Sequence, residues 1–346
     1  MEDSTIIVTG GAGYIGSHTI IELMERTPFK VLSLDNHANS SPRTYSRIEA
    51  ISGRRVRSIQ VDLCDREATL RAVAEAGQVK GIIHFAAFKS VPESVREPGL
   101  YYRNNIVSLL NVLEAAGAYR VPHFIFSSSC SVYGNLAELP VREDSPLGQP
   151  ESPYAHTKQV GERIVQAHAD VMPELNAISL RYFNPVGAHR SGLLGEDPIN
   201  PPTNLVPVIM RVAVGRMPEV VVHGGDYDTR DGSCIRDYVH VSDIATAHVK
   251  ALEHSMRAPM APNHAIFNLG TGQGVSVLEA ITAFESVTQQ RLNYRIGPRR
   301  AGDVAAIYTD TRRTEQALGW KAEHSLNEMM ATAWAWEQHL LQEAKG

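Results

Sequence analysis

The stretch SPYAHTK, residues 152–158, places a tyrosine four residues before a lysine. Residues i and i+4 lie on one face of a helix, so Tyr154 and Lys158 should project to the same side. Pro153 suits the first turn of a helix and puts Tyr154 near its start. A free tyrosine has a pKa near ~10, and a nearby ammonium group lowers that pKa by favouring the phenolate. Such a tyrosine can take a proton from a substrate hydroxyl while hydride leaves the same carbon.

Spacing alone is weak support, because a chain with 12 tyrosines holds such a pair by chance in about one case in four. A third candidate group, a serine hydroxyl, strengthens the interpretation of this pair as a proton-transfer site. The run HFIFSSS ends in Ser127, Ser128 and Ser129, and one of these hydroxyls could reach the same substrate oxygen. The plain alternatives are an exposed tyrosine–lysine pair and a serine-rich turn. Downstream of a glycine loop, however, the three residue types together indicate a proton-transfer site.

That glycine loop is VTGGAGYIGSH, with Gly10, Gly13 and Gly16 between a strand-like run and a helical pattern. Residues without a Cβ allow a tight turn and let the backbone approach a pyrophosphate, while the helix start offers free N–H groups. The plain alternative is glycine needed only for packing. The strand–loop–helix context favours nucleotide binding.

Two acidic residues end the next strand-like runs. Asp35 stands about 20 residues after the loop, where a carboxylate binds ribose hydroxyls and repels a 2′-phosphate, so NAD is favoured over NADP. The plain alternative for Asp35 is a turn residue. Asp62 is expected to contact the adenine end, with a cap for the next helix as its alternative.

The first half of the chain alternates apolar runs with amphipathic ones. We expect strands at 5–10, 30–35, 56–62, 81–87, 123–129 and 177–183, and helices near 14–26, 66–76, 98–118 and 155–170. Nearly continuous apolar strands in a βαβ order predict an α/β fold with a doubly wound, Rossmann-type parallel sheet.

The sequence pattern changes after Phe183, where a long stretch rich in Pro, Gly and Asn shows no hydrophobic periodicity. A loop of this length in a compact fold is usually functional. We expect an NAD-binding domain over 1–180 and a smaller mixed α/β substrate domain over 181–346, with segments that return to the first domain. Ligands of such sheets bind outside the carboxyl ends of the strands.

Composition excludes several classes. The chain of 346 residues is 43 % hydrophobic and 21 % charged, with a net charge of −5 and no basic run, so neither disorder nor nucleic-acid binding is expected. No signal-peptide pattern and no apolar run of about 18 residues is present, so a membrane partner is not expected. Cys64, Cys130 and Cys234 are too scattered for disulfides or a metal site, which favours the cytoplasm. No metal site is expected among the histidines either.

Longer motifs carry a resemblance to a known family. The segments TGGAGYIGSH, FSSSCSVYG, SPYAHTK, LRYFNPVGAH, RDYVHVSD, NLGTG and RRAGD run through nearly the whole chain. With them the sequence resembles the extended short-chain dehydrogenase/reductase superfamily and, within it, the UDP-galactose (UDP-glucose) 4-epimerase family. RYFNPVGAH and RDYVHVSD are far more specific than the glycine loop.

The resemblance implies roles for individual residues. It makes Tyr154 the catalytic base, Lys158 its activator and ribose anchor, and Ser129 the hydrogen-bond partner. On the substrate side it implies Ser129, Tyr154, Asn184, Asn204, Arg236, Arg299, Asp303 and Ile307. The implied NAD contacts are Gly10, Gly13, Tyr14, Ile15, Gly16, Asp35, Asn36, Asp62, Leu63, Phe85, Ala86, Lys89, Asn104, Tyr154, Lys158 and Tyr182.

Charge supports part of this set, because a UDP pyrophosphate suits the forked donors of Arg236 and Arg299. The alternative for both arginines is a surface ion pair, for example with Asp237 or Asp303. Ile307 departs from the family pattern, in which a bulky tyrosine or a small cysteine limits space around the sugar C2 substituent. An intermediate side chain suggests partial acceptance of UDP-N-acetylhexosamines.

The resemblance implies UDP-galactose and UDP-glucose interconversion through a 4-ketopyranose with tightly bound NAD, in galactose metabolism, by a homodimer joined through helices near 98–118 and 155–170. One rival is a dehydratase or decarboxylase, but Cys130 and Ser131 follow Ser129 where a dehydratase usually has Asp-Glu. Other rivals are an ordinary dehydrogenase, which consumes NAD⁺, and a non-catalytic nucleotide-binding scaffold, which commonly loses the tyrosine or lysine.

Overall fold

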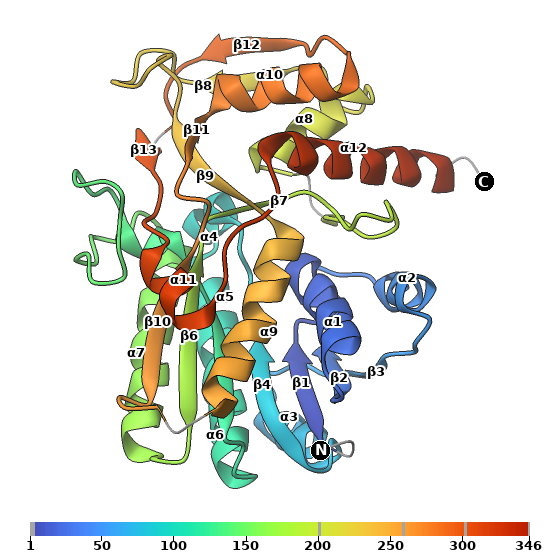
Figure 1. Ribbon diagram of the computed structural model, residues 1–346, viewed down its shortest axis with the longest axis vertical. Helices are drawn as coiled ribbons and strands as arrows, with labels where there is room; N and C mark the ends of the chain where they lie inside the picture. The colour runs from blue at the N-terminus through green and yellow to red at the C-terminus, as the bar shows by residue number, and fades with distance from the viewer. Residues whose placement is uncertain (1–3, 200–201, 258–259, 301–302, 345–346) are drawn as a thin grey trace.

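A seven-stranded parallel sheet forms the centre of the lower part of the molecule in Figure 1. The structure is a computed structural model, and it describes residues 4–199, 202–257, 260–300 and 303–344. The strand order is β10-β6-β5-β4-β1-β2-β3, and every neighbouring pair is parallel. This order confirms the predicted doubly wound, Rossmann-type sheet: the chain adds strands outward from β1 on one side and outward from β4 on the other, so the strand order reverses between β1 and β4. The strands are β1 Thr5–Thr9, β2 Lys30–Asp35, β3 Arg57–Gln60, β4 Val79–His84, β5 His123–Ser129, β6 Asn176–Tyr182 and β10 His264–Leu269.

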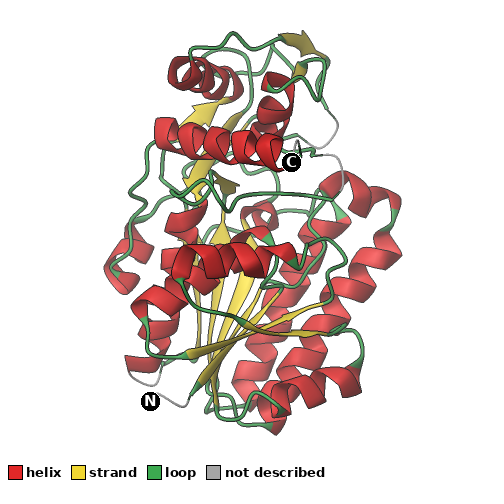
Figure 2. Cartoon of the chain, turned by 90° about the vertical axis from the view of Figure 1, so that its right-hand side faces the viewer, coloured by secondary structure: helices red, strands yellow, loops and turns green. Residues whose placement is uncertain are grey.

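Helices cover both faces of this sheet, as Figure 2 shows. Alternate side chains of each strand enter two separate apolar cores: Ile6 and Val8 of β1 belong to one, and Ile7 to the other. The first core is closed by α1 Tyr14–Arg26, α2 Arg43–Ser52, α9 Val241–Arg257 and α11 Arg312–Leu318. The second core is closed by α3 Arg66–Ala74, α6 Ser108–Ala118 and α7 Pro153–Val171.

A second, smaller set of elements lies above the carboxyl ends of the strands in Figure 1. It has a four-stranded sheet around β9, a two-stranded sheet and a core of its own. Its strands are β7 Asn184–Val186, β8 Val220–His223, β9 Ile235–His240, β11 Gly274–Ser276, β12 Tyr294–Gly297 and β13 Ala306–Ile307. Its helices are α8 Leu205–Ala213, α10 Val277–Thr288 and α12 Leu326–Glu343.

Several elements differ from the sequence-based expectation. The pattern at 98–118 is three successive pieces, α5 Pro98–Tyr102, a π-helical turn over Arg103–Val107 and α6. The helices α2 and α4 Val91–Arg96 were not predicted. Strand β3 is shorter than predicted and mostly exposed, because it lies at the edge of the sheet.

The chain returns to the large sheet after residue 180. Strand β10 pairs with β6 along its whole length, and α9 packs beside α1 in the first core. Segments far apart in the sequence therefore complete the sheet that holds the site. Within the residues described, no helix combines the length and apolar character needed to cross a bilayer.

Helix α7, which carries the SPYAHTK stretch, packs closely on β5. Ser152 caps its start by accepting from the N–H of Ala155, and Pro153 occupies the first turn, as predicted. Gly161 lies in its middle, where a Cβ would stand 2.6 Å from Cζ of Phe126. The missing side chain lets the helix approach the strand.

Gly161→Ala should therefore destabilise the protein, although alanine favours a helix over glycine by about 1 kcal/mol. Overpacking against Phe126 is expected to cost about 1–3 kcal/mol, measured by urea unfolding. The matched control is Gly99→Ala in α5, where nothing lies within 4 Å of the new Cβ. Equal stabilities of the two variants would contradict the close docking of α7.

Candidate active site

A cavity of about 970 Å³ opens along the carboxyl ends of the strands, lined by residues of the large sheet and of the smaller set of elements. This is where a doubly wound sheet binds its ligands, and the volume suits a large small-molecule ligand. Every residue that the sequence assigned to NAD lines it, as do all the assigned substrate and catalytic residues except Arg299. The structure thus brings together residues from strands β2, β5 and β6, from the loops that follow β1, β3 and β4, and from the smaller part.

The glycine loop forms a cradle at one end of the cavity. Gly10 has φ +67°, a left-handed conformation, and a Cβ there would stand 2.8 Å from the backbone nitrogen of Ala86. Gly13 precedes α1 without a side-chain cap, and no acidic residue occupies the first turn of the helix. The N–H groups at this helix start are therefore available to an anion, so the loop fits a dinucleotide pyrophosphate.

Asp35 is buried at the end of β2 and is shared with the glycine loop. Its Oδ2 accepts from the N–H of Ala12 at 3.0 Å, and its Oδ1 accepts from the N–H of His37 at 2.9 Å. These bonds fix the carboxylate at the cavity wall, where a ribose would lie. Asp62 also lines the cavity, but the following helix is capped by Asp65 and not by Asp62.

Tyr154 is partly buried at the start of α7, and Lys158 is almost fully buried one turn later. The Nζ of Lys158 donates to the carbonyl oxygen of Ser127 at 2.6 Å and stands 5.9 Å from the centre of the Tyr154 ring. Burial lowers the pKa of Lys158 to about 8, and the Glu162 carboxylate opposes that shift. The predicted face shared by Tyr154 and Lys158 is thus present at the end of β5.

The prediction that Lys158 lowers the pKa of Tyr154 was wrong for the chain without ligands. Burial raises the pKa of Tyr154 to about 12, and a hydrogen bond with Ser129 offsets part of the rise. The reason is geometric, because the ammonium group is directed to the Ser127 carbonyl. Ser129 itself is buried at the last position of β5, which makes it the serine of the three that faces Tyr154.

Lys89 and Tyr14 meet the long loop that follows β7. Lys89 Nζ donates to Glu196 Oε1 at 2.6 Å, and it lies over the Tyr14 ring at 5.8 Å. The hydroxyl of Tyr14 donates to the Gly187 carbonyl, and Trp336 Nε1 donates to the Glu196 carbonyl at 3.0 Å. These hydrogen bonds hold the loop after β7 in place across the end of the cavity that is proposed to bind the cofactor.

Tyr182 and Phe85 form the inner wall of the same end. The hydroxyls of Tyr182 and Ser127 are hydrogen-bonded, and burial raises the pKa of Tyr182. Both aromatic rings lie near His248, at 5.8 Å for Tyr182 and 4.6 Å for Phe85. Within the described parts of the chain, no group of three or more His, Cys, Asp or Glu side chains is arranged to hold a metal ion.

Two arginines and one aspartate line the opposite end. Arg236 Nη1 donates to the carbonyl of Val304 at 2.8 Å, and its Nη2 stands 3.7 Å from Asp303 Oδ1. Arg300 makes a forked contact with Asp303, at 2.8 and 3.1 Å. The cavity end thus offers forked cationic donors, with Asn184 on β7 and Asn204 before α8 beside them.

Arg299 does not line the cavity, and here the sequence assignment was wrong. Its Nε donates to Asp226 at 2.8 Å and its guanidinium lies 4.3 Å from the centre of the Tyr227 ring. The neighbouring Arg300 takes its place. The signal that could have separated them is the spacing, since Arg300 lies three residues before Asp303 and pairs with it.

Comparisons with known proteins agree with this geometry. Residues 6–270 match the model of the NAD dependent epimerase/dehydratase family. The UDP-glucose 4-epimerase of Erwinia amylovora is 44 % identical over 333 residues, which are 96 % of this chain and 97 % of that protein.

Two solved structures are similar over almost the whole fold. The UDP-glucose 4-epimerase of Bifidobacterium longum in complex with NAD⁺ and UDP has a TM-score of 0.92 and 44 % identity, over 97 % of this chain and 98 % of that one. The enzyme of Stenotrophomonas maltophila with bound NAD and formylated UDP-arabinopyranose has a TM-score of 0.94 and 42 % identity, over 98 % of this chain and 99 % of that one.

Proposed function

The chain belongs to the NAD dependent epimerase/dehydratase family, and we propose that it interconverts UDP-galactose and UDP-glucose with NAD as a resident cofactor. The observation that carries this proposal is one continuous cavity with a dinucleotide cradle at one end, forked arginines at the other and Tyr154 between them. When bound, NAD⁺ accepts a hydride from C4 of the sugar and returns it, so that a 4-ketopyranose links the two sugars. The cofactor is regenerated in each turnover and need not leave.

Tyr154 is the proposed base for the sugar 4-hydroxyl, and Ser129 the partner that shares the oxygen. Burial keeps the Tyr154 hydroxyl protonated in the chain alone, so phenolate formation depends on positive charge supplied beside it. Lys158 carries such a charge at neutral pH, because its pKa of about 8 lies above that range. A base held next to the reacting hydroxyl needs no diffusion to reach it.

The UDP part of the substrate is the proposed anchor. Arg236 and Arg300 are suited to the pyrophosphate, because guanidinium groups form paired hydrogen bonds with phosphate oxygens. Binding energy placed on this remote part lets the sugar ring stay loosely held and turn over between the two hydride transfers. The residues proposed to hold the anchor accordingly lie at one end of the cavity, and the proposed base lies between the two ends.

The rival chemistries are less favoured. Water elimination needs an added acid near the sugar, but burial raises the pKa of the Cys130 thiol to about 12 and Ser131 is not an acid. A non-catalytic scaffold has no need for a buried lysine aligned with a tyrosine and a serine. An ordinary dehydrogenase differs in consuming NAD⁺ in proportion to product.

We propose a homodimer, with α5, α6 and α7 in the interface. Apolar side chains are exposed on α5, α6 and the preceding α4, among them Leu100 at 44 %, Leu110 at 40 % and Val95 at 60 %. Contiguous exposed apolar side chains mark interaction surfaces. Sedimentation equilibrium tests the proposal, and a species with the mass of one chain contradicts it.

A cytoplasmic location is also proposed. The three cysteines, Cys64, Cys130 and Cys234, are all free thiols, and free thiols persist in a reducing compartment. Fractionation of the source cells tests this location, and recovery of the protein from the medium contradicts it.

Tyr154→Phe should lower kcat for UDP-galactose by about 10²–10⁴-fold, because the base is removed while the ring is kept. The assay follows UDP-glucose formation by the wild type and the variant, without added NAD. Tyr294→Phe is the control, since that tyrosine is exposed on β12 and does not line the cavity. Near-normal turnover by Tyr154→Phe would eliminate this residue as the base, and an inactive wild type would refute the proposed function.

Arg300→Ala should weaken UDP binding by about 10–100-fold, the effect of losing a charge-assisted hydrogen bond of about 1.5–3 kcal/mol. Arg299→Ala is the matched control and should change binding less than about 2-fold, since this side chain pairs with Asp226 outside the cavity. Titration calorimetry with UDP measures both. The reverse pattern would restore Arg299 as the ligand.

Partial turnover of UDP-N-acetylgalactosamine is proposed from Ile307. This side chain lines the cavity and packs in a small apolar cluster with Val132, Tyr133 and Phe183. Wild-type protein should turn over the N-acetylated sugar more slowly than UDP-galactose, and Ile307→Tyr should remove only the slower activity. Complete inactivity of the wild type toward the N-acetylated sugar contradicts the proposal.

A further inference from the structure

A buried ion pair lies between α7 and the sheet, outside the cavity. The side chains of Glu162 and Arg181 are only 5 % and 3 % exposed. Arg181 donates from Nε to Oε1 at 2.8 Å and from Nη2 to Oε2 at 2.7 Å, while the Ser128 hydroxyl also donates to Oε1. Both carboxylate oxygens are satisfied, so the pair is stable only while each partner remains in place.

Its position relates it to the proton-transfer residues. Glu162 follows Lys158 by four residues, one turn further along the same face of α7. Arg181 stands opposite Ser128 in the β5–β6 register, and each is next in sequence to a cavity residue, Tyr182 and Ser129. The ion pair therefore joins the helix and both strands that supply the site, directly behind it.

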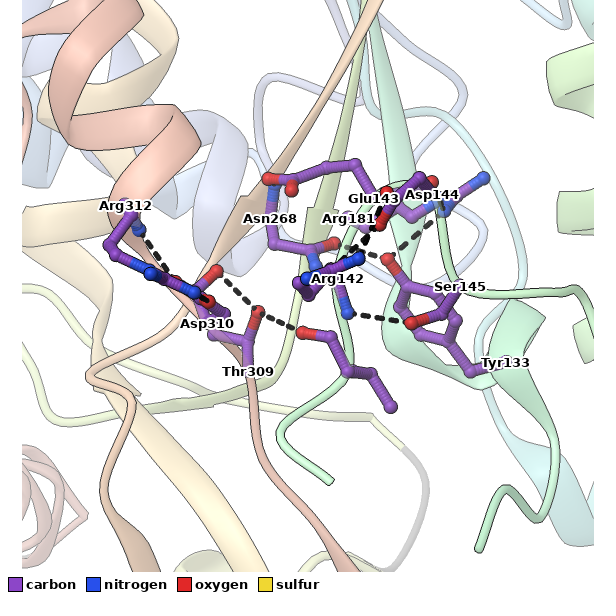
Figure 3. Close-up of polar contacts among 11 residues, drawn as sticks. Tyr133, Arg142, Glu143, Asp144, Ser145, Arg181, Asn268, Thr309, Asp310 and Arg312 are labelled. Carbon is purple, nitrogen blue, oxygen red and sulfur yellow. Dashed lines mark hydrogen bonds and ion pairs between the residues drawn. The ribbon is translucent and has the colours of Figure 1, made fainter. Parts of the chain in front are cut away.

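Arg181 extends the contact to the segment between β5 and α7, as Figure 3 shows. Its Nη1 donates to the Tyr133 hydroxyl at 3.0 Å and to the Glu143 carbonyl at 3.3 Å. The Tyr133 hydroxyl in turn donates to Asn268 on β10 at 2.7 Å. One guanidinium thus holds the turn after Ser129 and the segment that leads to Tyr154.

The same segment is bound to the strand that carries Ile307. Val141 N–H donates to the Tyr308 carbonyl at 2.9 Å, and Asp310 N–H donates to the Val141 carbonyl at 2.9 Å. Thr309 Oγ1 donates to that carbonyl as well, at 3.2 Å (Figure 3). The network around Arg181 therefore continues from the proton-transfer helix to the residues that follow Ile307.

The negative charge of Glu162 also stabilises the protonated form of Lys158. Burial lowers the pKa of Lys158 to about 8 and Glu162 opposes the shift, whereas burial lowers the pKa of His84 to about 3 and leaves it neutral. Among the described residues, the titratable groups that interact with Lys158 are His84 on β4 and Tyr154 and Glu162 on α7, and Arg181 on β6 pairs with Glu162.

We propose that Glu162 and Arg181 are positioning residues for proton transfer, which hold Lys158 and Tyr154 against β5 and β6 and supply the negative charge behind Lys158. The inference rests on the proposed function, since it concerns how that reaction is supported. Neither side chain lines the cavity, so both act through Lys158 and Tyr154 and not on substrate or cofactor.

The test is the pH profile of kcat for Glu162→Gln, which keeps the size of the side chain and removes its charge. Without the carboxylate, and with Arg181 left unpaired nearby, Lys158 should lose its proton more easily. The alkaline limb of kcat should move to lower pH by about one unit, with KM for UDP-galactose changed less than about 2-fold. Bound NAD should stay at the wild-type level.

Glu337→Gln is the matched control. Glu337 is also a buried carboxylate between two arginines, Arg211 at 3.8 Å and Arg216 at 3.4 Å, but it lies on α12 outside the large cavity. Its loss should affect stability and leave the alkaline limb in place. A Glu162→Gln profile that coincides with those of the wild type and this control overturns the proposal.

Arg181→Lys keeps the positive charge but loses the forked contact with Glu162 and the Nη1 bonds to Tyr133 and Glu143, so it tests the proposal even if Glu162→Gln does not fold. It should lower kcat by about 10-fold without moving the alkaline limb, and wild-type kcat would overturn the proposal. Wild-type protein that does not turn over UDP-galactose would instead refute the proposed function, so the two failures are distinguishable.

Discussion

The buried hydrogen bond from Lys158 Nζ to the Ser127 carbonyl, 2.6 Å long, joins α7 to the end of β5, and the rest of the site depends on this junction. It fixes how far the helix reaches past the sheet. Tyr154, one turn earlier, then emerges at the cavity wall next to Ser129. A shift of α7 by a single residue would rotate Tyr154 by about 100° and remove it from the cavity. Gly161 and the Glu162–Arg181 pair secure the same contact further along the helix.

The cavity separates tight binding from chemistry. The glycine loop and Asp35 form one end on the large sheet, and Arg236 and Arg300 form the other on the smaller part. Both ends suit phosphates and riboses, which do not react. In the proposed function the sugar lies between them, beside Tyr154, and is held through its UDP part, so it can be released from one orientation and held again in another. This arrangement agrees with an enzyme that returns hydride to the carbon it came from.

Much of this was predictable from the sequence because it is local. The strand–loop–helix order around Gly10 and the i, i+4 spacing of Tyr154 and Lys158 each define a small piece of backbone, and the structure has both. The features that the sequence did not predict correctly depend on tertiary contacts. Adjacent arginines differ in sequence only in their spacing from Asp303, and which of them lines the cavity depends on which side of the chain faces it. The pKa of Tyr154 is raised because burial outweighs a lysine directed elsewhere. The return of later segments to the first domain was expected, but which segments return, β10 and α9, is set by long-range pairing and packing.

The central claim is that one site removes a hydride from C4 and returns it to the same carbon while its cofactor stays bound. The direct measurement uses UDP-galactose that carries deuterium at C4, in ordinary water and without added NAD. The account predicts UDP-glucose that retains the deuterium at C4 in full. Hydrogen from solvent at that carbon, or a requirement for added NAD, would contradict it.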